Sequence, residues 1–466
     1  MHKIHILFLI LLVGALNACA STTLKIYSVN SLESSVENSA SFKGLERLAD
    51  ALPESDVKRI NIIYLHGVGW IENPEDTPLA NNFITGVANG YSLVVEDKVV
   101  SSVCGRQKEN EQNETQNHII INNTKPLSFQ TTLPGSEVIL DDLVCMDKQV
   151  LRVNEDLEYV FYRIFWDEIF WSKLQYPHIG QDDNVNSKDD VASLRRRYNG
   201  YLKDKLINFG FSDAVMYLGP AGQEIRDAIR GAMCSAALDS AGFSFQQQGY
   251  KTDFETVCQT ASNTNIISHP FAFVTESLGS KIAYDIMREA MTDGQDNIHD
   301  EMIKGTELYM LANQIALLSL NDLSPDARMA PALFNDEDRP TIIALSEVND
   351  FLTYELVPFY RQLLQNSNRV SGDLKDISEE GYRRTIRDLL GFNVVDMRVE
   401  FASPLIPLVS GFVDPLYAHN GHSRQPELMR YILCGSKHGQ INEIDCASSR
   451  STRGLRLTDA LGFNAP

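Results

Sequence analysis

The alternation of short apolar runs with helix-like segments constrains this chain more than any other feature. Apolar runs typical of buried strands lie at residues 59–66, 157–166, 271–275, 307–312, 340–348 and 394–401. Segments with apolar residues at helical spacing separate several of them, for example Leu278, Ile282 and Ile286 after the third run. Strands that alternate with helices usually pair in parallel, so the sequence predicts an α/β fold with a mostly parallel sheet flanked by helices.

Two regions are predicted to be insertions into this sheet. Residues 92–157 are polar with strand-like stretches, and residues 167–262 contain a charged segment followed by helix-like stretches. The first is predicted to be a β-rich insertion and the second a helical, lid-like segment. Their length alone suggests that they cover a functional site of the domain. The predicted organisation is a signal peptide at 1–18, a tether and N-terminal segment at 19–58, and one domain at 59–466.

Charge limits the partners that this chain can have. The 41 Lys and Arg residues against 62 Asp and Glu residues give a net charge of −21. Nucleic-acid binding depends on basic side chains concentrated enough to neutralise phosphates, and no such concentration occurs here. The sequence therefore predicts no nucleic-acid partner.

The first residues have the layout of a secretory signal peptide. Lys3 precedes an apolar run, Ile4–Leu16, which is shorter than the roughly 20 residues of a spanning helix. The letters LNAC that end at Cys19 resemble the lipobox of bacterial lipoproteins, in which cleavage leaves the cysteine as a lipid-carrying first residue. The resemblance implies a lipid anchor at Cys19 in an outer membrane. A plain secreted protein cut near Ala18 is the alternative.

Export would place the remaining cysteines in an oxidising compartment. They are Cys104, Cys145, Cys234, Cys258, Cys434 and Cys446. An even count favours disulfides, with pairing between sequence neighbours as the simplest arrangement and free buried thiols as the alternative. Possible zinc ligands also cluster near the end of the chain: His419, His422, Cys434, His438 and Cys446. Their spacing fits no standard zinc pattern, so no metal is predicted.

The stretch FAFVTESLGSKIAYD at 271–285 combines an apolar strand, a tight turn and a helix. Its centre, TESLG, resembles the G-x-S-x-G turn that presents a nucleophilic serine, with Thr275 at the first glycine position and Gly279 at the second. Ser277 is therefore a candidate nucleophile, and a serine that merely begins a helix is the alternative. A nucleophilic serine needs a histidine to take its proton, a carboxylate to orient that histidine, and N–H donors for the oxyanion.

Candidates for two of these partners follow other predicted strands. HGVGW at 66–70 is a Gly-rich turn directly after a buried strand and is the candidate source of N–H donors. A tight turn that binds no ligand could have the same sequence. Asp350 lies just past the strand-like run at 340–348, and Glu347 is the nearer carboxylate at the same strand end. Either carboxylate could instead be a solvated loop residue.

The candidate bases lie in YAHNGHSRQPELMRYIL, after the last predicted strand. Many α/β-hydrolases end with a catalytic histidine, an aromatic residue or second histidine three positions on, and a proline that opens the final helix. His419, His422 and Pro426 resemble that arrangement. This favours His419 as the base, with His422, which follows a glycine, as the alternative.

Taken together, these motifs resemble the α/β-hydrolase superfamily, its serine esterases and lipases in particular, over roughly residues 59–435. The chain order serine, aspartate, histidine is the order of that family, and one predicted strand separates each candidate from the next. The resemblance implies catalytic roles for Ser277, Asp350 and His419, and an oxyanion hole made by the backbone N–H groups of Val68 and Leu278.

The sequence therefore predicts an exported, lipid-anchored serine hydrolase that cleaves carboxylic esters through an acyl-enzyme. Such an enzyme needs no cofactor and no metal, and its partners are an ester or lipid substrate and, through Cys19, a membrane. A transacylase with the same triad is the alternative within enzymes. A non-catalytic surface-binding lipoprotein is the alternative outside them, but a binding protein has no need of a complete triad.

Overall fold

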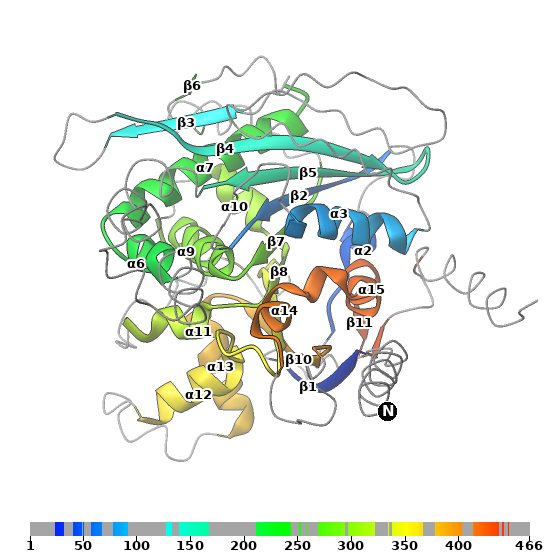
Figure 1. Ribbon diagram of the computed structural model, residues 1–466, viewed down its shortest axis with the longest axis vertical. Coiled ribbons are helices and arrows are strands. Elements are labelled where there is room, and N and C mark those ends of the chain that lie inside the picture. Colours follow the sequence, from blue (N-terminus) through cyan, green and yellow to red (C-terminus); the bar gives the residue numbers. More distant parts are fainter. Residues whose placement is uncertain are drawn as a thin grey trace, which may run out of the picture.

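A computed structural model of the chain (Figure 1) describes most of the predicted domain. The described residues are 24–31, 41–48, 50, 57–67, 78–91, 127–132, 139–166, 211–243, 251–252, 258, 269–293, 297–321, 334, 338–366, 378–402, 413–437, 440–441 and 446. The predicted signal peptide, Cys19 and Val68 lie outside them. Among the described residues, no helix is both long and apolar enough to cross a membrane.

A single mixed sheet forms the centre of the molecule (Figure 1), in the order β1-β10-β9-β8-β7-β2-β5-β4-β3-β6 among the described residues. Its strands are β1 (Lys25–Ser31), β2 (Lys58–Leu65), β3 (Leu127–Thr132), β4 (Ile139–Arg152), β5 (Leu157–Phe165), β6 (Lys251–Thr252), β7 (Phe271–Glu276), β8 (Glu307–Leu311), β9 (Thr341–Glu347) and β10 (Asn393–Glu400). The strands from β10 to β5 are all parallel, whereas β1 and β4 run antiparallel to their neighbours. The predicted mostly parallel α/β sheet is confirmed.

Helices cover both faces of this sheet. They are α2 (Leu45–Leu48), α3 (Pro78–Gly90), α6 (Ser212–Leu218), α7 (Ala221–Ser240), α9 (Leu278–Asp293), α10 (Asn297–Ile303), α11 (Ile315–Leu318), α12 (Leu356–Asn366), α13 (Glu379–Leu390), α14 (Pro415–Asn420) and α15 (Pro426–Cys434). Helices α2, α3 and α15 pack on one face, and α7, α9, α10, α12 and α13 on the other (Figure 1). Short 3-10 turns, η9 (Ser319–Asn321) and η11 (His422–Arg424), and a small pair of strands, β11 (Ser436–Lys437) and β12 (Gln440–Ile441), complete the described elements.

The apolar runs seen in the sequence follow from this three-layer arrangement. Successive side chains of a strand point to opposite faces, so Ile62 of β2 lies in one core and Ile63 in the other. Because both faces are covered by helices, both sets of positions are mostly apolar. Burial of each such side chain contributes about 1.5–3 kcal/mol, which explains why the central strands are nearly all apolar.

The N-terminal segment differs from the predicted tether. Part of it, β1, is an edge strand antiparallel to β10. The backbone N–H groups of Lys43 and Gly44 donate to the buried carboxylate of Glu307 at 2.5 and 3.0 Å, and Phe42 pairs with Ser436. Residues 25–31 and 42–48 therefore belong to the folded domain. The β1 sequence, KIYSVNS, is half polar, so it lacks the apolar run that predicts a buried strand.

The two predicted insertions have different outcomes. In the first, β3 and β4 form an antiparallel hairpin that extends the sheet beyond β5, in agreement with a β-rich insertion. In the second, α7 belongs to the helical layer of the domain: Ile225, Ile229 and Met233 lie in the core. A lid covering a site is expected to lie outside that core, so the described helix α7 does not fit the lid predicted at 167–262.

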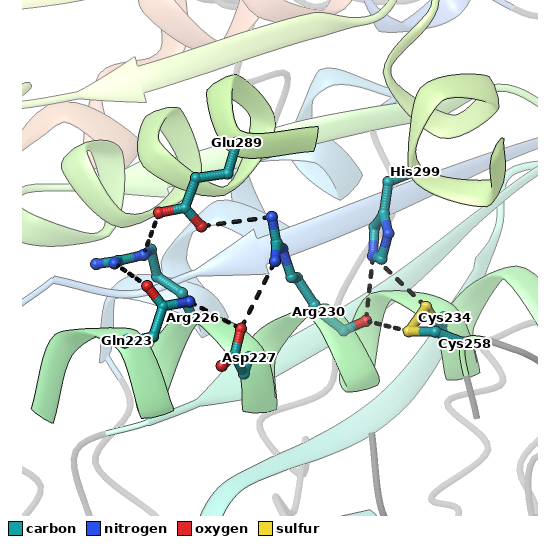
Figure 2. Close-up of polar contacts among 8 residues, drawn as sticks. All are labelled: Gln223, Arg226, Asp227, Arg230, Cys234, Cys258, Glu289 and His299. Carbon is teal, nitrogen blue, oxygen red and sulfur yellow. Dashed lines mark hydrogen bonds and ion pairs between the residues drawn. A yellow bond between two sulfur atoms is a disulfide. The ribbon is translucent and has the colours of Figure 1, made fainter. Parts of the chain in front are cut away.

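Helix α7 is fastened to its neighbours by polar contacts as well as by its core residues. Figure 2 shows Glu289 of α9 between Arg226 and Arg230 of α7, with N···O distances of 2.8 and 3.4 Å. At the other end of α7, Asp239 accepts from the Tyr162 hydroxyl of β5 at 2.6 Å and pairs with Lys148 of β4. These contacts join α7 to both the sheet and α9, so it is an integral part of the fold.

Two disulfides are present among the described residues. Cys234 of α7 is bonded to Cys258, beside His299 of α10 (Figure 2), and Cys434 of α15 is bonded to Cys446. Both join sequence neighbours, so this part of the predicted pairing is confirmed. Cys104 lies outside the described residues. In the loop-entropy account, a disulfide across a loop of this size stabilises the native state by about 3 kcal/mol.

We expect the cysteines of these two disulfides to resist iodoacetamide in the denatured, non-reduced protein and to react after reduction. Mass spectrometry of the labelled peptides measures this directly. Cys104 and Cys145 provide a comparison within the same sample, since neighbour pairing predicts that they also resist. Full labelling without a reductant would show that the thiols are free in the isolated protein.

Candidate functional site

The candidate residues meet at the carboxyl ends of the central parallel strands. From β2 the chain next joins the parallel sheet at β5 on one side, whereas from β7 it continues to β8 on the other side. Adjacent strands β2 and β7 therefore form a topological switch point, where α/β sheets have a crevice that binds ligands. His66 and Gly67 follow β2, and Ser277 follows β7.

Ser277 occupies a strained turn between β7 and α9. Its φ of 53° lies in the left-handed region, which costs a residue other than glycine about 1–3 kcal/mol. The turn is held by its backbone: the Ser277 N–H donates to the Leu311 carbonyl at 2.9 Å, and the Ser280 N–H donates to the Ser277 carbonyl at 3.0 Å. Strain of this kind at a strand–helix turn is typical of a serine that is presented to a reactant.

Two glycines allow the end of β2 to lie against this turn. A Cβ atom on Gly67 would lie 2.5 Å from the Ser277 Cβ, and one on Gly279 would lie 2.5 Å from the carbonyl oxygens of Leu65 and His66. Both distances are far inside van der Waals contact. Gly67 and Gly279 are thus required by the close approach of the end of β2 to the Ser277 turn.

Thr275, which replaces the first glycine of the G-x-S-x-G pattern, is fully buried. Its hydroxyl donates to the Tyr309 carbonyl of β8 at 3.3 Å and lies 3.1 Å from the Ser280 hydroxyl. The extra methyl and hydroxyl groups therefore have room and hydrogen-bond partners. The threonine ties the strand before the turn to the first turn of α9.

Ser277, His419 and Asp350 form a chain of hydrogen bonds. The Nε2 atom of His419, in α14, lies 2.8 Å from the Ser277 Oγ, and its Nδ1 atom lies 2.7 Å from the Asp350 Oδ2. All three side chains are buried. With Asp350 ionised, Nδ1 carries the ring proton and Nε2 is free to accept the serine proton. The structure thus brings together the three residues singled out in the sequence.

The charge state of Asp350 is set by its neighbours. Burial by itself raises the pKa of this carboxyl, but the hydrogen bond and charge of His419, with the Leu352 backbone N–H, hold it below the ordinary value for aspartate. The Leu352 N–H donates to the Asp350 Oδ1 at 2.9 Å. Asp350 is therefore a carboxylate at neutral pH and able to orient the histidine.

The two alternative residues have other contacts. Glu347 accepts hydrogen bonds from the Asn349 backbone N–H and from the N–H groups of Phe401 and Ala402 after β10. His422 is buried, and its Nδ1 lies 3.1 Å from the His419 carbonyl oxygen. Burial lowers the pKa of His422 to about 4, so its ring is neutral at pH 7. Neither Glu347 nor His422 completes the chain of contacts with Ser277.

His66 holds the turn after β2 in place. Its Nδ1 lies 2.7 Å from the Gly67 carbonyl, its Nε2 accepts from the Trp166 N–H at 3.3 Å, and its ring stacks on the Trp166 indole. The Trp166 indole N–H donates in turn to the His66 carbonyl at 3.0 Å. Leu278, one of the two predicted oxyanion donors, is the first residue of α9. Trp166 was not predicted to be a site residue. The only indication in the sequence is its position at the end of the apolar run 157–166.

The loop that carries Asp350 is clamped by two buried polar side chains that sequence reasoning missed. Asn313 lies just after β8 and follows Ala312, a second residue with a positive φ (56°). Its side-chain amide donates to the Ser346 hydroxyl at 3.1 Å and to the Tyr354 carbonyl at 3.2 Å. Asp396 of β10 accepts from the first two N–H groups of α12 at 3.1 and 2.6 Å. Both ends of the loop that carries Asp350, the acid loop, are therefore fixed to neighbouring strands.

Glu276, directly before Ser277, is also buried. Burial raises the pKa of its carboxyl to about 8, against the lowering effects of the Tyr64 hydroxyl and the Arg424 charge. The carboxyl is therefore mostly protonated at pH 7. A protonated neighbour adds no negative charge next to a serine oxygen at which negative charge would develop.

One group of possible metal ligands occurs among the residues that the structure describes. Cys234, Cys258 and His299 have ligand atoms within 4.8 Å of one another. Because the two cysteines are joined in a disulfide, they offer no thiolate to a metal. The zinc ligands considered near the C-terminus are affected in the same way, since Cys434 and Cys446 are bonded to each other.

Comparisons with models of protein families, with curated proteins and with solved structures find no significant match to this chain.

Proposed function

We propose that this protein is an exported serine hydrolase that cleaves carboxylic esters through a Ser277–His419–Asp350 triad and an acyl-enzyme. The observation that carries the proposal is the continuous contact from the Ser277 Oγ to His419 and on to Asp350, at 2.8 and 2.7 Å, on a serine in the left-handed region. A serine at a helix start without a catalytic role needs neither the strain nor the partners.

The proposed reaction proceeds in two halves. His419 takes the Ser277 proton while the serine oxygen attacks the ester carbonyl, and the protonated histidine then donates to the departing alcohol. Water, deprotonated by His419, next attacks the acyl-enzyme and releases the acid. Asp350 holds the ring and stabilises its positive charge, and it does not itself take the proton.

The tetrahedral oxyanion requires donors that are in place before the reaction. The backbone N–H of Leu278, at the N-terminus of α9, is the first proposed donor, and Val68 after the HG turn is the second. The contact of Gly67 with Ser277 supports this arrangement, because it keeps the HG turn against the nucleophile.

The proposal extends to the fold class. The chain order Ser277, Asp350, His419 is that of α/β-hydrolases, with β8 and β9 between the first two and β10 between the last two. We propose that the domain is a variant of that fold. Export and a lipid anchor at Cys19 remain part of the proposal on the sequence alone.

The experiment that tests this function is labelling of the purified mature protein with a fluorophosphonate probe, followed by an acyl-ester panel of increasing chain length. We expect one labelled residue, Ser277, and turnover of at least one ester. Added acceptor alcohols distinguish a transacylase, which would form a new ester in preference to the free acid. A non-catalytic binding protein would give neither labelling nor turnover.

The clamp on the acid loop gives a further prediction. Asn313→Ala should lower kcat for ester hydrolysis by about 10- to 100-fold with little change in KM, because Ser346 and the Tyr354 carbonyl lose their shared donor, at a cost of about 1–3 kcal/mol. Steady-state kinetics on the best ester of the panel measures the effect. Asn393→Ala is the matched control, because Asn393 is the first residue of β10 and lies at the amino ends of the parallel strands. A lower melting temperature with unchanged kcat would mean that Asn313 only stabilises the fold.

A further inference from the structure

A cavity of about 250 Å³ lies between α3 and the segment formed by η11 and the start of α15. Its polar lining comes from Asn82, Thr85, Asn89, Ser423, Arg424 and Arg430. The two helices touch closely along one side of it, since a Cβ atom on Gly86 would lie 2.9 Å from the Met429 Cγ. The polar residues therefore gather around an opening beside a tight helix–helix contact.

Six of the ten described lining residues carry side-chain hydrogen-bond donors, and some of these are positively charged. Among the described residues that line it, two are arginines and none is an aspartate or glutamate, in a chain whose net charge is −21. The amide and hydroxyl side chains can also donate. Helix α15 begins at the cavity with Pro426, and the N-terminus of a helix favours a negative charge. Charge and donors therefore both suit an anion.

Two donors at this cavity have no hydrogen-bond partner in the part of the chain that the structure describes. The Ser423 side chain is 2% exposed and its hydroxyl makes no hydrogen bond, and the buried amide nitrogen of Asn82 makes none either. A buried donor left unpaired is unfavourable, because it has lost its hydrogen bonds to water without gaining another partner. Side chains of this kind on the wall of a cationic cavity indicate a ligand that accepts hydrogen bonds.

We propose that this cavity binds an oxyanion, a phosphate or carboxylate group, between Arg424, Ser423 and Asn82. The site lies next to the proposed triad: Ser423 follows His422 directly, and the Arg424 charge acts on Glu276, the residue before Ser277. The anion is either free in solution or part of an ester substrate. Anion binding does not rest on the proposed hydrolase function. Only the assignment of the anion to an ester substrate rests on it.

Direct binding is measured with inorganic phosphate, by isothermal titration calorimetry and by phosphorus NMR line broadening, on the Ser277→Ala protein. We expect saturable binding that weakens at least about tenfold in Arg424→Gln, which removes a charge-assisted hydrogen bond. Ser423→Ala should weaken it by about five- to tenfold. Arg384→Gln, an exposed arginine of α13, is the matched control and should bind as the parent does.

Absence of saturable phosphate binding, or equal binding by all four proteins, would overturn the proposal. A second arm identifies the source of the anion by comparing esters that carry a carboxylate or phosphate with neutral esters of equal length. If the anion belongs to the substrate, Arg424→Gln raises the ratio of KM for the charged ester to KM for the neutral one. An unchanged ratio with retained phosphate binding assigns the site to a free anion. Loss of all ester turnover with intact phosphate binding would refute the hydrolase function alone.

Discussion

Replacing Ser277 with alanine should lower kcat for ester hydrolysis by at least about 10³-fold and abolish fluorophosphonate labelling. Loss of a triad member removes the nucleophile or its activation, an effect of at least about 4 kcal/mol on the barrier. The fold should persist, because the change deletes one hydroxyl whose contact is His419, at 2.8 Å. The backbone hydrogen bonds of the turn remain available to alanine. Steady-state rates and circular dichroism of the variant measure both effects.

Ser280→Ala is the matched control for this substitution. Ser280 is buried two residues into α9, and its hydroxyl lies 3.1 Å from that of Thr275. Its contacts support the turn but do not include His419, so we expect kcat within a few-fold of the parent. A folded Ser277→Ala protein with near-parental turnover would refute the assignment of the nucleophile.

The sequence predicts the central sheet well because the physical signal is local. Each parallel strand is buried on both faces, so β2, β7, β8 and β9 appear as continuous apolar runs that no surface segment would carry. The strand order could not be obtained in the same way, since it depends on which apolar edges pair. The edge strand β1 shows the limit: its pairing with β10 is made by backbone hydrogen bonds that its half-polar sequence does not reveal.

The candidate site was predictable where its residues sit in a recognisable local context. Ser277 is preceded by a strand and followed by a helix, and Asp350 and His419 follow later strands in the expected order. Asn313 and Asp396 have no such context, because their hydrogen-bond partners lie far away in the sequence. Asn313 bonds to Tyr354, 41 residues away, and Asp396 bonds to Leu356, 40 residues away. A buried polar residue acquires its partner only when the strands are placed side by side, so the clamp on the acid loop required the structure.

The sequence left two histidines as candidate bases, and their environments in the structure differ. His419 contacts both Ser277 and Asp350. His422 packs edge to face against Phe401, with ring centroids 5.0 Å apart, and burial lowers the pKa of its ring to about 4. A buried ring that resists protonation is a poor proton acceptor at neutral pH, whereas a base must accept the serine proton and release it again.

We therefore expect His419→Ala to lower kcat by at least about 10³-fold, as loss of a triad member does, and His422→Ala to lower it far less. His422→Ala should instead reduce the melting temperature, because it removes a buried ring and the contact with the His419 carbonyl. Kinetics and thermal unfolding of the two variants, measured side by side on the same ester, separate these effects. The reverse pattern, with activity surviving loss of His419 but not of His422, would move the base to His422 and leave Ser277 and Asp350 as they are.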